Sequence, residues 1–349
     1  PSREHLRVGA GEEAVLSFRA DAGGGVVLEK TMRFRGDRYG FGLEVGYRGL
    51  QADTELLVSW LDGVAITEGQ AGVDLGEARV VALFNGAVEK VQVDGDDREE
   101  IFDDKGLVQW AGARSKYFLT AVAPTAPAER TAVRLTGAGR GKGELPAYRF
   151  ELGTRAGRDG AWAGLVYAGP LEYDELARYQ LEFERAIDFG WPVVKQITWF
   201  LLVVFKATYK TVPNYGWIIV IFAVAIKLIL YPLTAKTYES GTKMQQLQPK
   251  IAALREKYRN DQQRLSRETM RLYKEEGVNP MGGCLPLLVQ LPILWALYTL
   301  FLNAIELRHA PFFGWILDLS AKDPWFILPI LMTLSSLFQV WLNPKPPDP

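Results

Sequence analysis

Hydrophobic and polar positions follow two different patterns along this 349-residue chain. Up to about Tyr167, short runs rich in Val, Phe, Leu and Tyr are separated by Gly, Asp and Asn. Alternation with a period of two, bounded by turn residues, predicts half-buried antiparallel strands, and many such runs predict a β-sandwich. The clearest strands are predicted at 26–34, 41–47, 80–84, 88–93, 117–122 and 148–152, with Phe41, Leu43, Val45 and Tyr47 on one face, and loops at 20–25 and 137–142.

Helical spacing begins after the last predicted strand. Between Leu171 and Ile187, apolar residues recur every three or four positions, which predicts a short helical connector at the end of a β domain covering residues 1–188. Residues 189–212 follow, with an apolar run at 197–205 flanked by lysines. A span needs about 20 apolar residues, so this run predicts an amphipathic helix at the membrane interface, with a spanning helix as the alternative.

Three later segments have the length and apolar character of membrane spans. They are 213–234, 281–305 and 325–343, and aromatic residues stand at their ends, as expected at a membrane interface. A loop at 306–324 separates the second from the third, and residues 344–349 begin the next loop. The fold class expected is thus an α-helical membrane core joined to an all-β domain.

The segment 235–279, between the first two spans, is strongly basic. It carries ten Lys and Arg against six acidic residues, so the positive-inside rule places it in the cytoplasm and residues 1–188 on the outer side. Apolar residues from Met244 to Tyr258 follow a 3,4,3,4 spacing, and Asn260-Asp261 breaks the helix and can cap a second one. The segment therefore predicts a basic helical hairpin.

Two interpretations of this hairpin stay open. Its charge can simply set the topology of a solvated linker, or it can form a docking arm for a ribosome, a targeting factor or a nascent chain, because cationic surfaces attract polyanions. The candidate docking residues are Lys243, Lys250, Arg255, Lys257, Arg259, Arg264 and Arg267.

Lys227 is the residue of most interest in the predicted spans. It lies in the inner half of the first span, where a charge costs about 2.5 to 3.5 kcal/mol and usually faces a wet cavity. The alternative is that its long side chain reaches the headgroups. Gln290 and Gln339 also interrupt apolar runs, and with Lys227 and Ala223 they are the candidates for a hydrophilic groove. The alternative is that each glutamine alone forms a hydrogen bond between two helices.

Charge divides the chain in the same way as hydropathy. Residues 1–190 carry 23 basic and 31 acidic residues, and residues 191–349 carry 17 and 10, which predicts different surroundings for the two parts.

The single cysteine, Cys284, allows no intrachain disulfide. No phosphate-binding loop, nucleophile motif or metal-ligand spacing occurs, so we expect no enzyme, cofactor, metal or small-molecule substrate, and no specific nucleic-acid partner.

Acidic pairs were the remaining candidates for catalysis. Asp96-Asp97, Glu99-Glu100 and Asp103-Asp104 are interpreted as solvated turns, with glycosidase carboxylates as a remote alternative. Two other functional classes stay open on the residues alone. One is a membrane-anchored carbohydrate-binding protein, and the other is a channel or secondary transporter, which usually has repeated halves.

The second part of the chain resembles the core of the YidC/Oxa/Alb membrane-protein insertases. The stretches that carry the resemblance are 227–234, 243–244, 247–251, 272–274, 278–286, 290–293, 296–298, 306–308, 323–324 and 327–329, including Lys227-Leu228-Ile229-Leu230-Tyr231-Pro232 and Asn279-Pro280-Met281-Gly282-Gly283-Cys284. Residues 116–118 and 169–191 are similar to the periplasmic β-supersandwich of the Gram-negative type.

The resemblance implies an inner-membrane insertase with a hydrophilic groove open to cytoplasm and lipid. It implies nascent membrane proteins, lipids, the Sec translocon with its accessory subunits, and the ribosome or signal recognition particle pathway as partners. Lys227 takes the family's single cationic groove position, where Arg is commoner, so a bidentate hold on a carboxylate is not expected. Against the family pattern we expect three of five core spans, a partial supersandwich and no N-terminal anchor helix.

Overall fold

The computed structural model describes residues 7–51, 53–65, 76–93, 98–141, 144, 146–277 and 285–342, without the side chains of 236–240 and 285–287. The chain divides into two compact units, one formed by residues 1–188 with 303–305 and the other by residues 189–302 with 306–349. We call them the β unit and the helical unit. Cys284 and Asp96-Asp97 lie outside the described residues.

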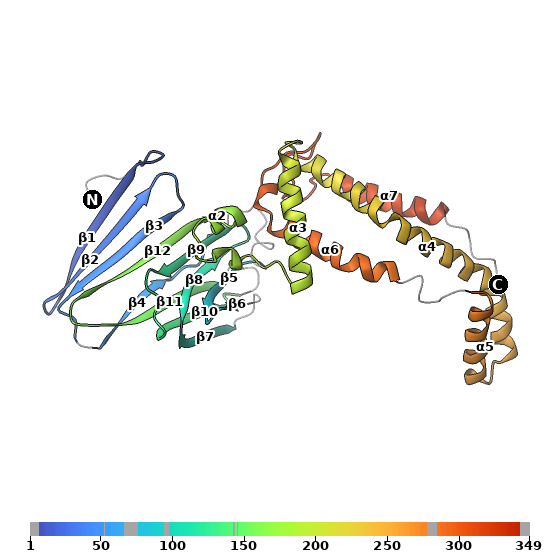
Figure 1. Ribbon diagram of the computed structural model, residues 1–349, viewed down its shortest axis with the longest axis horizontal. Helices are drawn as coiled ribbons and strands as arrows, with labels where there is room; N and C mark the ends of the chain where they lie inside the picture. Colours follow the sequence, from blue (N-terminus) through green and yellow to red (C-terminus); the bar gives the residue numbers. More distant parts are fainter. Residues whose placement is uncertain are drawn as a thin grey trace. The chain divides into compact units, whose positions relative to one another are not determined.

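Twelve strands are described in the β unit, and every pairing between them is antiparallel. They form an eight-stranded sheet in the order β1-β2-β3-β12-β9-β8-β5-β6 and a four-stranded sheet in the order β4-β11-β10-β7 (Figure 1). The strands are β1 (Glu13–Gly23), β2 (Val26–Arg35), β3 (Gly40–Arg48), β4 (Thr54–Trp60), β5 (Arg79–Phe84), β6 (Ala87–Val91), β7 (Glu99–Gly106), β8 (Val108–Arg114), β9 (Phe118–Pro124), β10 (Thr131–Ala138), β11 (Ala147–Ala156) and β12 (Gly160–Pro170).

The two sheets share one apolar core, which confirms the predicted sandwich. Val80 and Val108 of the larger sheet and Leu135 and Phe150 of the smaller one belong to the same cluster, and all four are fully buried. The residues predicted to share a face of β3 do so, because Leu43 lies in this core and Phe41 and Val45 pack against it. Alternating side chains thus explain how one face of each strand reaches the core.

Some strand ends were placed wrongly by the sequence pattern. The predicted loop at 20–25 is mostly strand, since β1 continues to Gly23 and a tight glycine turn leads into β2. Glu99-Glu100 and Asp103-Asp104 lie within β7 and not in turns. This strand is at the edge of the smaller sheet, where outward side chains meet solvent, so acidic residues are tolerated in it.

The connector at 171–187 is helical, as predicted, and consists of two short helices. These are α2 (Tyr173–Ala177) and the 3-10 helix η1 (Phe183–Ala186). Between them Gln180 and Glu182 have φ values of 55° and 58°, in the left-handed region that a right-handed helix cannot contain. The three- and four-residue apolar spacing therefore reflects packing of side chains onto the sheet.

The connector covers part of the outer face of the larger sheet. Val166 belongs to the core between the sheets, so the next residue of β12, Tyr167, points to the outer face. There its ring centroid lies 5.2 Å from that of Tyr179 and 5.7 Å from that of Phe183. Tyr179 Oη accepts a hydrogen bond from Gly40 N at 2.8 Å, and a Cβ atom on Gly40 would lie 2.6 Å from the Tyr179 ring. Gly40 therefore lets the connector pack closely.

The remaining described elements are helices. They are α3 (Pro192–Tyr209), α4 (Tyr215–Lys257), α5 (Gln262–Glu275), α6 (Leu285–Asn303), the 3-10 helix η3 (Ile305–Leu307) and α7 (Ile327–Leu342). By length and composition, one helical segment of the described chain can cross a membrane, Tyr215–Ala235, with a mean hydropathy of 2.4. Leu288–Asn303 and Ile327–Leu342 are shorter apolar helices.

The predicted hairpin is present, but its first arm continues directly from the apolar segment of α4. Figure 1 shows α4 as one long helix with α5 beside its far end. Leu247 and Ile251 are buried against α5, with Leu272 and Tyr273 packed on them. The second helix begins as predicted, because Asp261 Oδ1 accepts a hydrogen bond from Arg264 N at 2.9 Å.

Candidate functional site

The candidate groove residues Ala223 and Lys227 lie on the apolar part of α4. The helix begins at Tyr215, where Asn214 Oδ1 accepts a hydrogen bond from Trp217 N at 3.2 Å. Ala223 and Lys227 are four residues apart, so they share one face about 6 Å apart along the axis. Both are exposed, and in the described structure the Lys227 side chain forms no ion pair or hydrogen bond with a protein group. The charge of Lys227 is therefore open to an incoming group.

The two glutamines of the predicted groove lie on other helices. Gln290 is half-buried in α6, and Gln339 is exposed in α7. Among the described residues, no hydrogen bond joins either amide to the other or to Lys227. The grouping of these residues in one groove therefore stays a prediction.

Helix α3 packs one apolar face within the helical unit and exposes the other. Phe205 is fully buried, and its ring stacks on Tyr215 with centroids 5.2 Å apart. Thr198 is also fully buried, and its hydroxyl donates to Val194 O at 2.9 Å. In contrast Val193 is 65% exposed and Phe200 60% exposed, and these residues are two helical turns apart on one face. A helix that is apolar on both faces is expected where one face meets protein and the other meets lipid.

All seven candidate docking residues of the hairpin are exposed. Lys257 Nζ lies 5.5 Å from the ring centroid of Tyr258, and the guanidinium of Arg264 lies 5.4 Å from it on the second arm. Lys250 is bound to Glu276 in an ion pair. The hairpin thus presents cations from both arms, held by a small apolar core.

A loop before α7 contains an ordered carboxylate that the sequence pattern did not reveal. Asp318 Oδ1 accepts hydrogen bonds from His309 N at 3.0 Å and Ser320 N at 2.8 Å, and its other oxygen lies 3.0 Å from His309 Nδ1. Burial raises the pKa of Asp318, but the hydrogen bonds from Ser320 and His309 outweigh it, so the pKa lies below its ordinary value. This carboxylate therefore stays ionised and organises the loop.

Sequence reasoning also missed a buried arginine at the end of the β unit. The Arg114 side chain is 0% exposed, and its Nη1 donates to Ala186 O at 2.8 Å. Its Nη2 lies 3.3 Å from Glu77, which also binds Arg79. Burial, together with the neighbouring Arg79, lowers the pKa of Arg114 to about 10. Because Asp188 forms ion pairs with Arg79 and Lys90, basic residues of β5, β6 and β8 fix the end of the connector.

These groups do not form a metal site. In the described ranges, no group of three or more His, Cys, Asp and Glu residues is placed to hold a metal ion. The organised polar groups of the described chain are instead hydrogen-bonded carboxylates and arginines, whose roles in the geometry above are structural.

Two family models match the chain over almost its whole length. The model for the YidC periplasmic domain matches residues 3–204, and the model for the 60Kd inner membrane protein matches residues 207–349. The curated relatives include "Membrane protein insertase YidC" of Geobacter sulfurreducens, 37% identical over 351 residues. The protein of the same name from Syntrophus aciditrophicus is 37% identical over 350 residues.

The matches cover more of this chain than of the relatives. They include 100% and 97% of this chain but 65% and 62% of the two relatives, so the chain spans less than two thirds of their length. A solved structure described as an active YidC insertase with the first transmembrane domain resolved is similar over 96% of this chain and 70% of its own, at 19% identity and a TM-score of 0.39. The two family models together show that the chain belongs to the YidC family of inner-membrane proteins and contains that family's periplasmic domain.

Proposed function

We propose that this chain is part of a non-enzymatic membrane-protein insertase and chaperone. Membership of the family and the insertase function named for its relatives favour this role over a carbohydrate-binding protein or a transporter. The observation that carries the proposal is the exposed Lys227 on a long apolar helix. An ionised side chain in that setting needs water or a polar partner, and so marks a hydrated niche within lipid.

The mechanism follows from the cost of moving polar groups through hydrocarbon. An isolated peptide or carboxylate loses its hydrogen bonds to water there, which is the main barrier to translocation. Lys227, Gln290 and Gln339 offer one cation and two amides, which would replace part of that hydration for the polar region of a client. The apolar part of the client would meanwhile slide into lipid along the exposed apolar surfaces of α4 and α7.

The partners follow from the topology that we propose. In this topology, residues 1–188 lie in the periplasm and α3 lies at the membrane interface. Residues 213–234, 281–305 and 325–343 span the membrane, and residues 235–279 lie in the cytoplasm. The basic hairpin docks a ribosome or the signal recognition particle pathway, since its cations are exposed on both arms. Nascent membrane proteins are the clients, lipids surround the spans, and the Sec translocon is the cooperating partner.

A photocrosslinker on α4 tests where clients pass. We would place it at Ala223, on the face of Lys227, in the intact protein, and capture stalled single-span nascent chains. Ala225 is the matched control, because it is also an exposed alanine but lies about 200° around the helix. Preferential capture at 223 is expected. Equal capture at both positions would reject a client path along the Lys227 face.

Charge reversal tests the electrostatic role of Lys227. Lys227→Glu should slow insertion of clients with acidic outer tails by about tenfold, equivalent to about 1.4 kcal/mol, whereas Lys227→Arg should retain insertion. Insertion of a client with a neutral tail is the internal control. If Lys227→Glu inserts acidic clients at the normal rate while remaining folded, the cation plays no part in translocation.

A further inference from the structure

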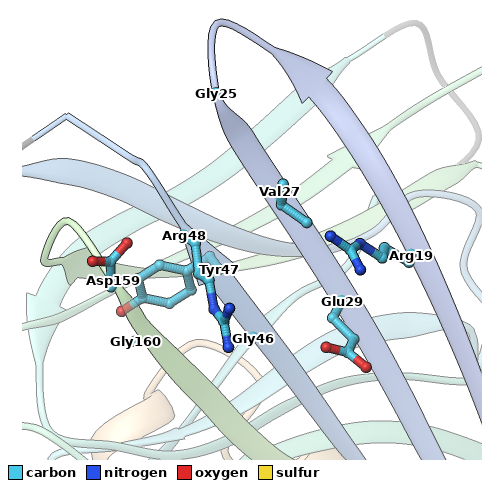
Figure 2. A pocket seen from close by; sticks show the side chains of 9 residues that line it. All are labelled: Arg19, Gly25, Val27, Glu29, Gly46, Tyr47, Arg48, Asp159 and Gly160. Carbon is cyan, nitrogen blue, oxygen red and sulfur yellow. The ribbon is translucent and has the colours of Figure 1, made fainter.

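The outer face of the larger sheet contains a hollow at the end where β1, β2, β3 and β12 meet. Its volume is about 490 Å³, within the usual range of about 300–1,000 Å³ for sites of small organic ligands. The lining includes Arg19, Val27, Glu29, Gly46, Arg48 and Asp159. Figure 2 shows Arg19 on β1, Glu29 on β2 and Arg48 on β3 around the position of Gly46.

The strand register explains why these side chains converge. Glu29 pairs with both Arg19 and Gly46, so the three residues form one row across β1, β2 and β3 on the outer face. Val27 pairs with Arg48 in the next row on that face. Neighbouring strands lie about 4.8 Å apart, and Arg48 is two residues further along the sheet than the row of Arg19, an offset of about 7 Å. The backbones of the two arginines are therefore about 12 Å apart, a distance that two long side chains can bridge through a ligand.

Gly46 forms the floor, and the fold does not require a glycine there. A Cβ atom at 46 would meet only Glu29 O at 3.8 Å and Glu29 Cβ at 3.9 Å, which are ordinary contacts. Gly40 on the same strand differs, because the connector packs against it at 2.6 Å. Glycine weakens the interior of a strand and often marks the close approach of a ligand. The missing side chain at 46 therefore leaves room that no protein group fills.

The charged groups around this floor are available for binding. Among the described residues, the side chains of Arg19 and Arg48 form no ion pair or hydrogen bond, and the Glu29 carboxylate has no ion-pair partner although Glu29 pairs with Arg19 across the strands. Asp159 Oδ1 accepts a hydrogen bond from Gly49 N at 2.8 Å, which fixes the carboxylate at the rim. The hollow thus offers two guanidinium groups and two carboxylates to a ligand.

We propose that this hollow binds a phosphate-bearing ligand. The two oxygens of a carboxylate can both bind a single guanidinium group, whereas a phosphate group has enough oxygens to accept hydrogen bonds from two guanidinium groups on different strands. Glu29 and Asp159 then accept hydrogen bonds from hydroxyl or ammonium groups on the rest of the ligand. Two sources share this chemistry, a soluble phosphate ester and the headgroup of a phospholipid.

Calorimetric titration of the full chain in a maltoside detergent tests the proposal. The probes are glycerol 3-phosphate and glycerophosphoethanolamine, with glycerol as the uncharged control. Saturable binding of a phosphate probe is expected, and Arg19→Gln should weaken it by about tenfold or more, as for the loss of a charge-assisted hydrogen bond. Gly46→Leu, which fills the hollow, should abolish it.

Two control variants lie on the same outer face, outside the hollow. Gly42→Leu is matched to Gly46→Leu, since a Cβ atom at 42 meets only Arg33 Cβ at 3.8 Å, and Arg33→Gln is matched to Arg19→Gln. Both controls should bind normally. Tighter binding of dihexanoylphosphatidylethanolamine than of glycerophosphoethanolamine would identify a lipid headgroup as the source, and the reverse would identify a soluble ester.

Three results would overturn the proposal. They are no saturable binding of any phosphate probe, binding of glycerol as tight as that of glycerol 3-phosphate, and equal weakening by the control variants. The site lies in the β unit and does not depend on the proposed insertase role, so client insertion can be measured in the same variants and succeed or fail separately.

Discussion

The β unit and the helical unit place their large apolar side chains in opposite environments. In the β unit Phe150 and Leu135 are fully buried between two sheets, whereas in the helical unit Phe338 is 60% and Leu228 68% exposed. Only 11% of the apolar window of Tyr215–Ala235 is buried inside the protein. Similar apolar side chains therefore stabilise the two units in different surroundings. In the β unit they pack in the protein interior, and in the helical unit they face lipid.

The largest effect should come from making the same substitution in both units. Phe150→Ala removes a fully buried ring that stacks on Trp60, with centroids 6.5 Å apart, and should lower the free energy of unfolding of the β unit by about 3–5 kcal/mol. Hydrogen exchange of the β10 and β11 amides in the detergent-solubilised chain measures it.

Phe338→Ala is the matched substitution in the helical unit. It removes an exposed ring, leaves no cavity in a protein core, and should leave exchange of the strand amides unchanged. If both variants accelerated strand exchange equally, the two units would not be separate in stability, and the contrast between them would be wrong.

A smaller effect is expected at high pH, where the β unit should lose stability because of a buried tyrosine. Tyr167 is fully buried, and its hydroxyl donates to Pro170 O at 2.6 Å. Burial, assisted by Glu175, raises its pKa far above the ordinary value of about 10. A folded pKa raised in this way contributes stability that is present below pH 10 and is lost as the pH rises further.

The measurement compares the native chain with Tyr167→Phe from pH 9 upward. The difference in free energy of unfolding of the β unit should change by about 1.4 kcal/mol for each pH unit above 10. Arg114, whose lowered pKa acts in the opposite direction in this range, is present in both proteins and cancels. Parallel pH dependences would show that Tyr167 ionises without unfolding.

Much of the architecture could be predicted from local patterns. Period-two alternation identified β3 with the correct face toward the core, and the seam that includes Leu247 and Ile251 identified the hairpin, because these patterns report which side of one element is apolar. The cap at Asp261 was predictable for the same reason, since it depends on neighbours in sequence.

Features that depend on distant residues could not be predicted. Arg114 is buried because the end of the connector, 72 residues later, supplies a carbonyl for it. The hollow at Gly46 exists because strand register brings Arg19 and Arg48 to one face, and register between strands is not visible in a single strand's pattern. The candidate groove is untested for the same reason, since its residues come from three helices.

The smallest effect tests whether the exposed hairpin folds independently of either apolar environment. Asp261→Ala removes the side chain that caps α5 and should cost about 1 kcal/mol, because the Arg264 N–H loses its acceptor. Amide exchange in the first turn of α5 should rise about fivefold, while the strand amides of the β unit stay unchanged. Asp261→Asn retains a capping oxygen and is the control. If exchange in α5 did not rise, packing on Leu247 and Ile251 alone would fix the helix, and the hairpin's stability would come from its small buried core as in the β unit.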